Sequence, residues 1–369
     1  MVTNKKLLEI YNLTQKDFFK HKNQRSIHWQ KYYSSEKFED ENNLINFRKN
    51  RVLSEGLDDA INLQNKLNLI EVLEYFDHEF LKKNLPTKNI GNSNFSINFL
   101  GFYFDYGIIH HLKWFEEISK IIFKKSKIIC EIGGGFGSLA RIIINNYETK
   151  YILMDLPEAN LLSTFYLKEH FPKKKFYLYN NYLEATTPPI LKNLDNFDIY
   201  ILPPWCKFEK SLKIDCFINT RSMMEMNMNT IKKYFDLIHT HISSDGFFLN
   251  INRYEKTVVG EGEKICIHEY PYDSKWDVII SKPSFLQKGV HFLLTQRKVE
   301  NFKNNIKDEL NKIGILNDNH KRNYNINLIN IKNYFKKKTY KIIKKVLLFF
   351  FVEEKLKKIA RILYNMTKF

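Results

Sequence analysis

Two kinds of hydrophobic pattern divide the chain near residue 125. Before this point, apolar residues recur every three or four positions in residues 7–19 and 58–81, which predicts amphipathic helices. Residues 84–94 are rich in Asn, Ser, Pro and Gly and predict a loop. The aromatic segment 98–123 predicts a further helix. We therefore expect residues 1–124 to form a helical region that covers a substrate.

After residue 125, short apolar runs alternate with helical segments. The predicted strands are residues 127–132, 151–154, 175–179, 197–202, 214–219, 247–251, 276–280 and 291–294. The predicted helices are residues 138–146, 158–171 and 230–242. Such alternation is typical of a parallel sheet with helices on both faces. We predict an α/β fold with a doubly wound, mostly parallel sheet in residues 125–300, and a closing antiparallel hairpin from the last two strands.

Charge is distributed unevenly along the 369 residues. The formal net charge is +17, and residues 301–369 contribute +12 of it, from 17 basic and five acidic residues. The preceding 300 residues are nearly balanced. The longest apolar run, residues 346–352, is far shorter than the roughly 20 residues of a membrane-spanning helix. Lys and Glu interrupt the apolar stretches at the start of the chain, so we expect no signal peptide and a cytoplasmic protein.

The basic tail, residues 301–369, alternates lysines with apolar residues and predicts a basic amphipathic helix. Residues 335–365 are expected to contact either the anionic inner face of a membrane or a partner protein of glycan assembly. A solvated appendage in a Lys-rich chain is the alternative. The aromatic residues of the tail cluster instead of alternating with basic ones, so we expect no nucleic-acid partner.

The four cysteines stand far apart and form no CxxC pair. This spacing predicts neither a disulfide framework nor a zinc site. No other set of residues has a fixed metal-ligand spacing, and we predict no bound metal. The cysteines are expected to be small buried apolar residues.

A glycine-rich turn follows the first predicted strand of the sheet. Its sequence is Glu131-Ile132-Gly133-Gly134-Gly135-Phe136-Gly137, and it opens the helix 138–146. Glycines at alternate positions let the main chain turn tightly and approach a ligand closely. The next strand ends in Asp155, where a carboxylate can accept hydrogen bonds from both hydroxyls of a ribose. The turn lacks the sixth-position Gly or Ala of a dinucleotide site and the Lys of a P-loop.

The turn Glu131–Gly137 resembles the acidic-x-Gly-x-Gly-x-Gly turn of the class I S-adenosylmethionine-dependent methyltransferases. Residues 219–226 resemble the Asn-Thr-x-Ser-x-x-Glu-Met segment of a bacterial family of sugar O-methyltransferases associated with surface-polysaccharide biosynthesis of capsule or lipopolysaccharide. Further matching pieces are residues 46–48, 56–58, 155–157 and 250–253. The resemblance covers residues 40–300. It implies S-adenosylmethionine as cofactor and methylation of a hydroxyl on a sugar, nucleotide sugar or glycan.

The resemblance, with the rule that open α/β sheets bind ligands at the carboxyl ends of their strands, gives the candidate residues their roles. The cofactor-binding candidates are Glu131, Gly133, Gly135, Gly137, Asp155, Leu156, Pro203 and Asn219. The substrate-binding candidates are Ser222, Arg253 and Tyr106, and the catalytic candidates are Glu225 and His268. A sugar hydroxyl is a weak nucleophile near neutral pH, so a general base such as Glu225 is expected.

Several alternatives remain open from the sequence. Glu225 is equally typical of a helix N-terminus, and Arg253 of a surface ion pair. The adenine pocket is expected near Pro203 if residues 197–202 form the third strand, and near Asn180 and Asn181 if residues 175–179 do.

Residues 202–205, Leu-Pro-Pro-Trp, resemble an element of amino-methyltransferases that act on nucleic acid or protein. Leu202 cannot accept the hydrogen bond that the target amine donates in those enzymes. A methyltransferase fold without activity, retained as an assembly partner, is the non-enzymatic alternative.

Overall fold

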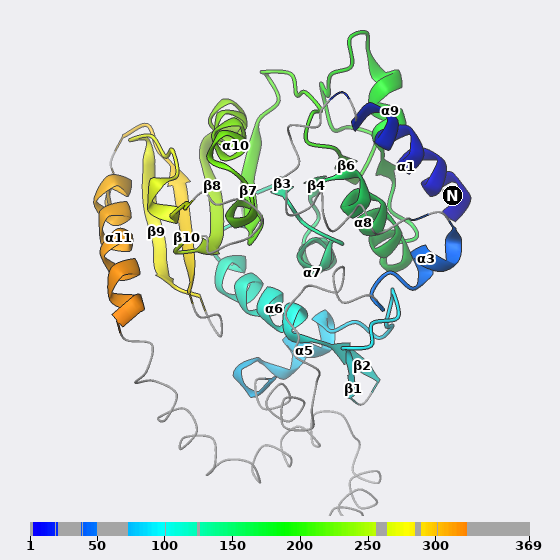
Figure 1. Cartoon of the computed structure of the whole chain (residues 1–369), viewed down its shortest axis with the longest axis horizontal. Coiled ribbons are helices and arrows are strands. Elements are labelled where there is room, and N and C mark those ends of the chain that lie inside the picture. Colours follow the sequence, from blue (N-terminus) through cyan, green and yellow to red (C-terminus); the bar gives the residue numbers. More distant parts are fainter. Residues whose placement is uncertain are drawn as a thin grey trace, which may run out of the picture. The chain divides into compact units, whose positions relative to one another are not determined.

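The computed structural model of the chain describes residues 3–18, 20, 38, 40–49, 73–99, 101–123, 126–255, 264–284, 289–300 and 302–322 (Figure 1). These residues belong to two compact units. The larger unit contains the described residues of Met1–Gly56, Ile90–Asn94 and His110–His320. The smaller unit contains those of Leu57–Asn89, Phe95–Ile109 and Lys321–Phe369. The predicted amphipathic segment 335–365 lies outside the described residues.

An eight-stranded sheet forms the centre of the larger unit, with the strand order β5-β6-β4-β3-β7-β8-β10-β9. The strands are β3 (Ile128–Ile132), β4 (Lys150–Met154), β5 (Phe176–Tyr177), β6 (Ile199–Leu202), β7 (Ile214–Thr220), β8 (Ile242–Arg253), β9 (Trp276–Pro283) and β10 (Val290–Arg297). The strands from β3 to β8 pair in parallel, and β10 pairs antiparallel with both β8 and β9. The predicted α/β class, the mostly parallel sheet and the closing antiparallel hairpin are confirmed.

Helices connect the parallel strands (Figure 1). The helices that lie wholly in the larger unit are α1 (Asn4–Phe18), α3 (Glu41–Ile45), α7 (Ser138–Asn146), α8 (Pro157–His170), α9 (Tyr179–Ala185), α10 (Met228–His241) and the short 3-10 helices η3 (Met223–Glu225) and η4 (Ile267–Glu269). α11 (Ile306–Arg322) begins in this unit. Right-handed crossovers that run in opposite directions from β3 and β7 put α7 and α10 on opposite faces of the sheet. Residues of β4 and β6 are accordingly buried on both faces.

The third strand of the parallel series is β6, because β6 pairs with β4. β5 pairs with the outer side of β6 and lies at the edge of the sheet. The expectation that residues 197–202 provide the third strand is therefore confirmed. All four cysteines are free and buried.

Two predicted helices of the N-terminal region differ in the structure. Residues 98–104 do not begin a helix but form a hairpin of β1 (Ile97–Phe99) and β2 (Phe102–Phe104). Gly101 adopts a φ of +86°, and its N–H donates to the side chain of Asn98 at 3.2 Å, which closes the turn. The helix α6 (Tyr106–Ser119) starts only after Asp105, whose carboxylate accepts from the N–H of Ile108 at 3.0 Å.

The helix predicted for residues 58–81 falls largely outside the described residues. Its described end is interrupted, because η2 (Leu73–Tyr75) stops before a new helix, α5 (His78–Asn84). Asp77 caps this helix by accepting from the N–H of Phe80 at 3.1 Å. The prediction of one helix that continues to residue 81 is therefore wrong.

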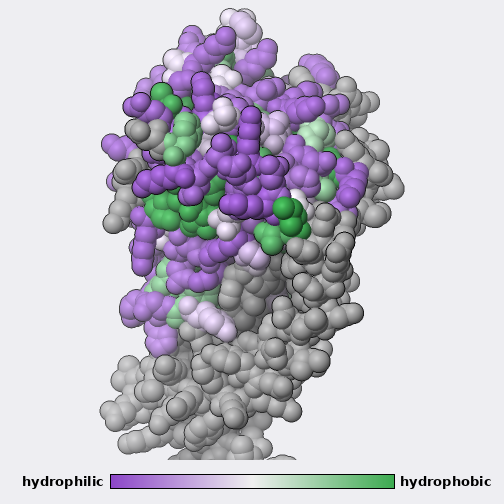
Figure 2. Space-filling model, turned by 90° about the vertical axis from the view of Figure 1, so that its left-hand side faces the viewer, coloured by the Kyte–Doolittle hydropathy of each residue, from purple (hydrophilic) through white to green (hydrophobic). Residues whose placement is uncertain are grey.

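The face of the larger unit that carries α11 and β9 is mostly hydrophilic, with hydrophobic side chains exposed among the polar ones (Figure 2). The exposed apolar residues of these and neighbouring segments are Ile279, Val299, Phe302, Ile315 and Leu316. Among the described residues, no helix combines the length and apolar character that crossing a bilayer requires.

Candidate functional site

The strand order reverses beside β3, because β4 follows it on one side and β7 lies on the other. In open α/β sheets, ligands bind outside the carboxyl ends of the strands at such a switch point. Here β3 ends in the glycine turn, residues 131–137, and β7 ends at Thr220. The two segments that the sequence marks as cofactor and acceptor candidates therefore meet at one place.

The glycine turn uses backbone conformations that favour glycine. Gly133, Gly135 and Gly137 have φ values of +72°, +57° and +88°. The N–H of Gly133 donates to the carbonyl of Met154 at 2.8 Å, which ties the turn to the end of β4. The N–H of Gly137 donates to the carbonyl of Gly134 at 3.0 Å and closes the turn before α7 begins.

Two glycines also allow close contacts that a side chain would prevent. A Cβ atom added to Gly133 would lie 2.0 Å from Oγ of Ser222. One added to Gly134 would lie 2.8 Å from Oε2 of Glu131. The turn is therefore packed between the segment after β7 and the carboxylate of Glu131.

Asp155 joins the end of β4 to the glycine turn. Its Oδ2 accepts from the N–H of Gly135 at 2.8 Å, and its Oδ1 accepts from the N–H of Leu156 at 2.7 Å. Burial raises the pKa of Asp155 to about 7, although both of these hydrogen bonds favour the charged form. Each oxygen keeps a further lone pair that can accept from a ligand hydroxyl.

Glu131 lies beneath the turn and is almost fully buried. Its Oε2 accepts a hydrogen bond from the hydroxyl of Tyr151 at 2.7 Å. Burial raises the pKa of Glu131 to about 7, against the effect of this hydrogen bond. In this position the carboxylate supports the turn from below.

Three fully buried asparagines, Asn219, Asn250 and Asn252, form an amide network at the carboxyl ends of β7 and β8. Nδ2 of Asn219 donates to the carbonyl of Ile132 at 2.8 Å and to Oγ of Ser222 at 2.6 Å. These bonds fasten β7 to the last residue of β3. The predicted cofactor residue Asn219 thus holds the base of the glycine turn.

Asn252 extends the network to the segment after β7. Its Nδ2 donates to Oδ1 of Asn219 at 2.9 Å, and its Oδ1 accepts from the N–H of Met224 at 3.0 Å. Asn252 also donates to Asn250, which in turn donates to the hydroxyl of Tyr272 at 2.9 Å. The network therefore fixes η3, which carries Glu225, relative to the glycine turn.

The second half of α6 runs along this edge of the sheet. Nδ1 of His111 lies 3.0 Å from Oγ of Ser138, the first residue of α7. One turn later, Nε1 of Trp114 donates to Oγ of Ser284 beyond β9 at 3.1 Å. The pKa of His111 is lowered to about 3, first by burial and then by the positive charges of Arg221 and Arg141. The imidazole is therefore neutral near pH 7.

The other predicted residues have varied surroundings. Ser222 donates to the carbonyl of Ile132 at 3.2 Å, and Arg253 is the last residue of β8 at the same edge. Glu225 ends η3, where its N–H donates to the carbonyl of Ser222 at 3.0 Å. His268 lies on η4 and packs against α11, since a Cβ at Gly314 would lie 3.4 Å from its ring.

Tyr106 belongs to the smaller unit, in which it begins α6. Pro203 is buried at the end of β6 and lines a small cavity together with residues of α1 and α8. Leu156 is buried immediately before α8. The roles assigned to these residues from the sequence stay predictions.

Sequence reasoning missed Arg221 and Arg141 and did not connect either of them with His111. Arg221 occupies the unspecified position of the Asn-Thr-x-Ser segment, so the resemblance gave it no role. Arg141 and His111 come from helices on either side of the turn. The only signal in the sequence was the adjacency of Arg221 to two singled-out residues.

The Leu-Pro-Pro-Trp segment is enclosed by α1. Nε1 of Trp205 donates to the hydroxyl of Tyr179 at 3.0 Å, and this hydroxyl donates to Oδ2 of Asp17 at 3.0 Å. The ring of Phe18 lies against the indole, with centroids 5.9 Å apart. The indole of Trp205 is thus part of the packing between α1 and the sheet.

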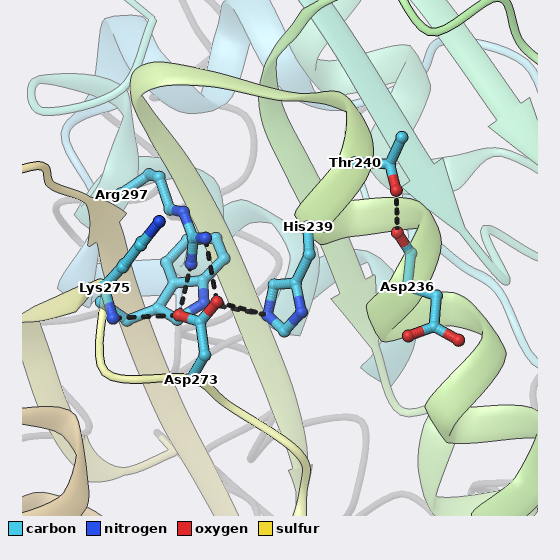
Figure 3. A network of polar contacts seen from close by, with 7 residues as sticks. Asp236, His239, Thr240, Asp273, Lys275 and Arg297 are labelled. Carbon is cyan, nitrogen blue, oxygen red and sulfur yellow. Dashed lines mark hydrogen bonds and ion pairs between the residues drawn. The ribbon is translucent and has the colours of Figure 1, made fainter.

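A second polar cluster lies at the opposite edge of the sheet (Figure 3). Arg297 ends β10, which runs against the parallel strands, and its guanidinium donates to both carboxylate oxygens of Asp273. The N–H of Lys275 donates to the same carboxylate at 2.9 Å, and Nε2 of His239 lies 4.0 Å from it. These partners outweigh burial and lower the pKa of Asp273.

Comparison with known proteins gives likenesses of fold. No family model matches the chain, and no curated protein matches it. A mutant of MtNAS in complex with S-adenosylmethionine is 13% identical, covers 67% of this chain and 82% of its own, and has a TM-score of 0.36. The mitomycin 7-O-methyltransferase MmcR is 12% identical (47% and 50% covered, TM-score 0.32).

A tRNA methyltransferase from M. jannaschii is also 12% identical, with 54% of this chain and 50% of that chain covered and a TM-score of 0.31. The chain thus spans about half the length of the last two proteins. At these identities and TM-scores, the likenesses establish neither a family nor a reaction for this chain.

Proposed function

We propose that the chain binds S-adenosylmethionine at the glycine turn and transfers its methyl group to an acceptor. The observation that carries this proposal is the glycine turn at the switch point of the sheet, joined to Asp155 through the N–H of Gly135. The absence of side chains at Gly133 and Gly134 supports a main-chain cradle. When bound, the cofactor supplies an electrophilic methyl group on a sulfonium.

Different residues of the site would bind different parts of the cofactor. The backbone of the glycine turn would hold the methionine part of the cofactor, and Asp155 would accept hydrogen bonds from the ribose. Leu156 would contribute apolar surface beside the adenine. Holding donor and acceptor in line accounts for much of the acceleration in such a displacement.

The acceptor that we propose is a sugar hydroxyl, on a nucleotide-linked or polymer-bound saccharide of surface-polysaccharide biosynthesis. Its support is the likeness of residues 219–226 to the sugar O-methyltransferase segment. η3 follows Ser222, which contacts the glycine turn, and its last residue, Glu225, would accept the hydroxyl proton. Arg253, at the end of β8, would bind a phosphate or carboxylate of the acceptor.

An amino group of nucleic acid or protein is the competing acceptor. Leu202 has no side-chain acceptor for an amine, and the indole of Trp205 is engaged with Tyr179 and Phe18. Both observations favour a hydroxyl acceptor over a planar base. Membrane or partner contact through residues 335–365, at the cytoplasmic face, remains a proposal from the sequence.

Isothermal titration with S-adenosylmethionine tests the cofactor assignment. We expect Asp155→Ala to raise the dissociation constant at least tenfold, about 1.4 kcal/mol, because it removes the ribose acceptor. Asp236→Ala, which changes an exposed carboxylate on α10, is the matched control and should bind like the wild type. Equal affinity of the Asp155→Ala variant and the wild type would contradict the ribose assignment.

A methyl-transfer assay then identifies the acceptor class. Labelled cofactor is incubated with the full chain and either nucleotide sugars or DNA. We expect label in the sugar. Label in DNA alone would contradict the hydroxyl assignment, and absence of cofactor binding would overturn the enzymatic proposal itself.

A further inference from the structure

Arg221 has an unusual backbone conformation at the switch point. Among the described residues, three that are not glycine have a positive φ: Asn92 at +54°, Asp245 at +62° and Arg221 at +62°. Asn and Asp tolerate this region because their short side chains bond to the local backbone, but Arg has no such compensation. Its conformation is held by its N–H, which donates to the carbonyl of Ile251 at 2.7 Å.

The conformation directs the chain from β7 onto the glycine turn. The next residue, Ser222, is the one whose Oγ would lie 2.0 Å from a Cβ on Gly133. The strained residue is therefore one position away from the closest contact with the turn. Backbone strain at such a position persists where the surrounding structure holds it, and it concentrates at functional sites.

Positive charge gathers around the start of α7. Arg141 is buried on α7, one turn after Ser138, whose Oγ lies 3.0 Å from Nδ1 of His111. Arg141 and Arg221 both lie close enough to the His111 ring to depress its protonation. The His111 ring, which both positive charges reach, contacts the first residue after the glycine turn.

This surrounding suits an oxyanion. A guanidinium presents two parallel N–H donors that match the oxygens of a carboxylate or phosphate. Glycine would occupy the position of residue 221 without strain. The strain therefore accompanies the presence of the arginine side chain at this position.

We propose that Arg221 binds an oxyanion, a carboxylate or phosphate group, beside the glycine turn. The inference rests on the proposed function, because the anion belongs either to the methionine part of the cofactor or to the acceptor. The methionine carboxylate and the phosphate of a nucleotide-linked sugar share this chemistry. The experiment below separates the two sources.

The decisive variant is Arg221→Gly, which keeps the backbone conformation and removes the guanidinium. Asp245→Gly is the matched control, because it also introduces glycine at a φ of +62°, in the exposed stretch near the start of β8. Arg221→Lys keeps the charge but not the paired donors. Binding is measured by calorimetry with three probes: S-adenosylmethionine, 5′-methylthioadenosine, which lacks the amino-acid part, and inorganic pyrophosphate.

We expect Arg221→Gly to weaken binding of S-adenosylmethionine or pyrophosphate at least tenfold, with an unfolding temperature no lower than that of the wild type. Loss for S-adenosylmethionine but not for 5′-methylthioadenosine identifies the cofactor carboxylate. Loss for pyrophosphate alone identifies an acceptor phosphate. Arg221→Lys should lose less than Arg221→Gly, and Asp245→Gly should bind all probes normally.

Three results would overturn the proposal. They are unchanged affinity for both anions, an equal loss for 5′-methylthioadenosine, or a lower unfolding temperature that accompanies the loss. A wild-type chain that binds pyrophosphate but neither adenosyl compound would reject the proposed function while leaving the anion site supported. A wild-type chain that binds none of the probes would reject both.

Discussion

The central sheet has an amino edge, where its parallel strands begin, and a carboxyl edge, where they end. Carboxylates are held in opposite ways at these two edges. At the amino edge, Arg297 donates to both oxygens of Asp273 and helps to lower the pKa of that carboxyl (Figure 3). At the carboxyl edge, burial raises the pKa of both Glu131 and Asp155 to about 7. At the amino edge, partners within the fold stabilise the charged form of Asp273. At the carboxyl edge, the charged forms of Glu131 and Asp155 keep an uncompensated desolvation cost. Strongly raised carboxyl pKa values in this setting are typical of ligand sites.

The means of fixing geometry differ as well. The amino edge uses an ion pair, whereas the carboxyl edge uses neutral amides and direct main-chain packing. Asn219, Asn250 and Asn252 are fully buried and bonded to one another. A satisfied amide network orders a buried segment without introducing further charge.

The largest effect is expected from Gly133→Ala. The new Cβ meets Oγ of Ser222 at 2.0 Å and requires a positive φ, so we expect a loss of about 3 kcal/mol in the free energy of unfolding and no measurable cofactor binding. Urea denaturation and calorimetry measure the two. Gly289→Ala is the control, because Gly289 has a φ of +71° and nothing within 4 Å of the new Cβ. Equal losses in the two variants would show that the contact with Ser222 is unimportant.

Asn252→Ala should have the next largest effect. It removes the donor to Oδ1 of Asn250 and the acceptor of the Met224 N–H, while Oδ1 of Asn219 keeps only the N–H of Met223. We expect a cost of about 2 kcal/mol in unfolding free energy. Asn146→Ala, which removes one partly buried bond to the carbonyl of Ile142, is the control in the same urea experiment. A change no greater than that of the control would contradict the role assigned to the amide network.

The smallest effect is a difference in pH dependence. The folded pKa of Glu131 is raised from 4.5 to about 7, so its contribution to stability is complete below pH 4.5 and is lost as pH rises through 7. Glu131→Gln should therefore flatten the decline of unfolding free energy between about pH 5 and 7. Asp273→Asn should instead flatten the decline of unfolding free energy at acid pH. With a lowered folded pKa, Asp273 contributes above its unfolded pKa and loses this contribution as pH falls. Identical slopes in wild type and variants, from urea titrations at several pH values, would remove the contrast between the edges.

Much of the sheet could be predicted from the sequence because its central strands are buried on both faces. β3, β4 and β7 are mostly apolar, and helix α7 follows the glycine turn within the predicted bounds. The secondary structure around Gly101 was harder to predict, since the aromatic residues there suit either a helix or a hairpin. There a positive φ and one bond from Gly101 to Asn98 decided for the hairpin.

The candidate site could be predicted only in its local parts. The turn and Asp155 lie close in sequence to the strands that position them. The conformation of Arg221 depends on Ile251, which is 30 residues away, and the partner of Asp273 is 24 residues away. Contacts of this range follow from the strand order, which no local pattern specifies.

The seating of Ser222 on Gly133 has a consequence for attempts to redesign the chain. Because Ser222, directly before η3, packs on Gly133, the proposed acceptor-binding segment and the proposed cofactor-binding turn are structurally coupled. Substitutions in residues 223–226 that are meant to change the preferred acceptor would then also change the affinity for the methyl donor. In this arrangement we expect acceptor selectivity and cofactor affinity to change together.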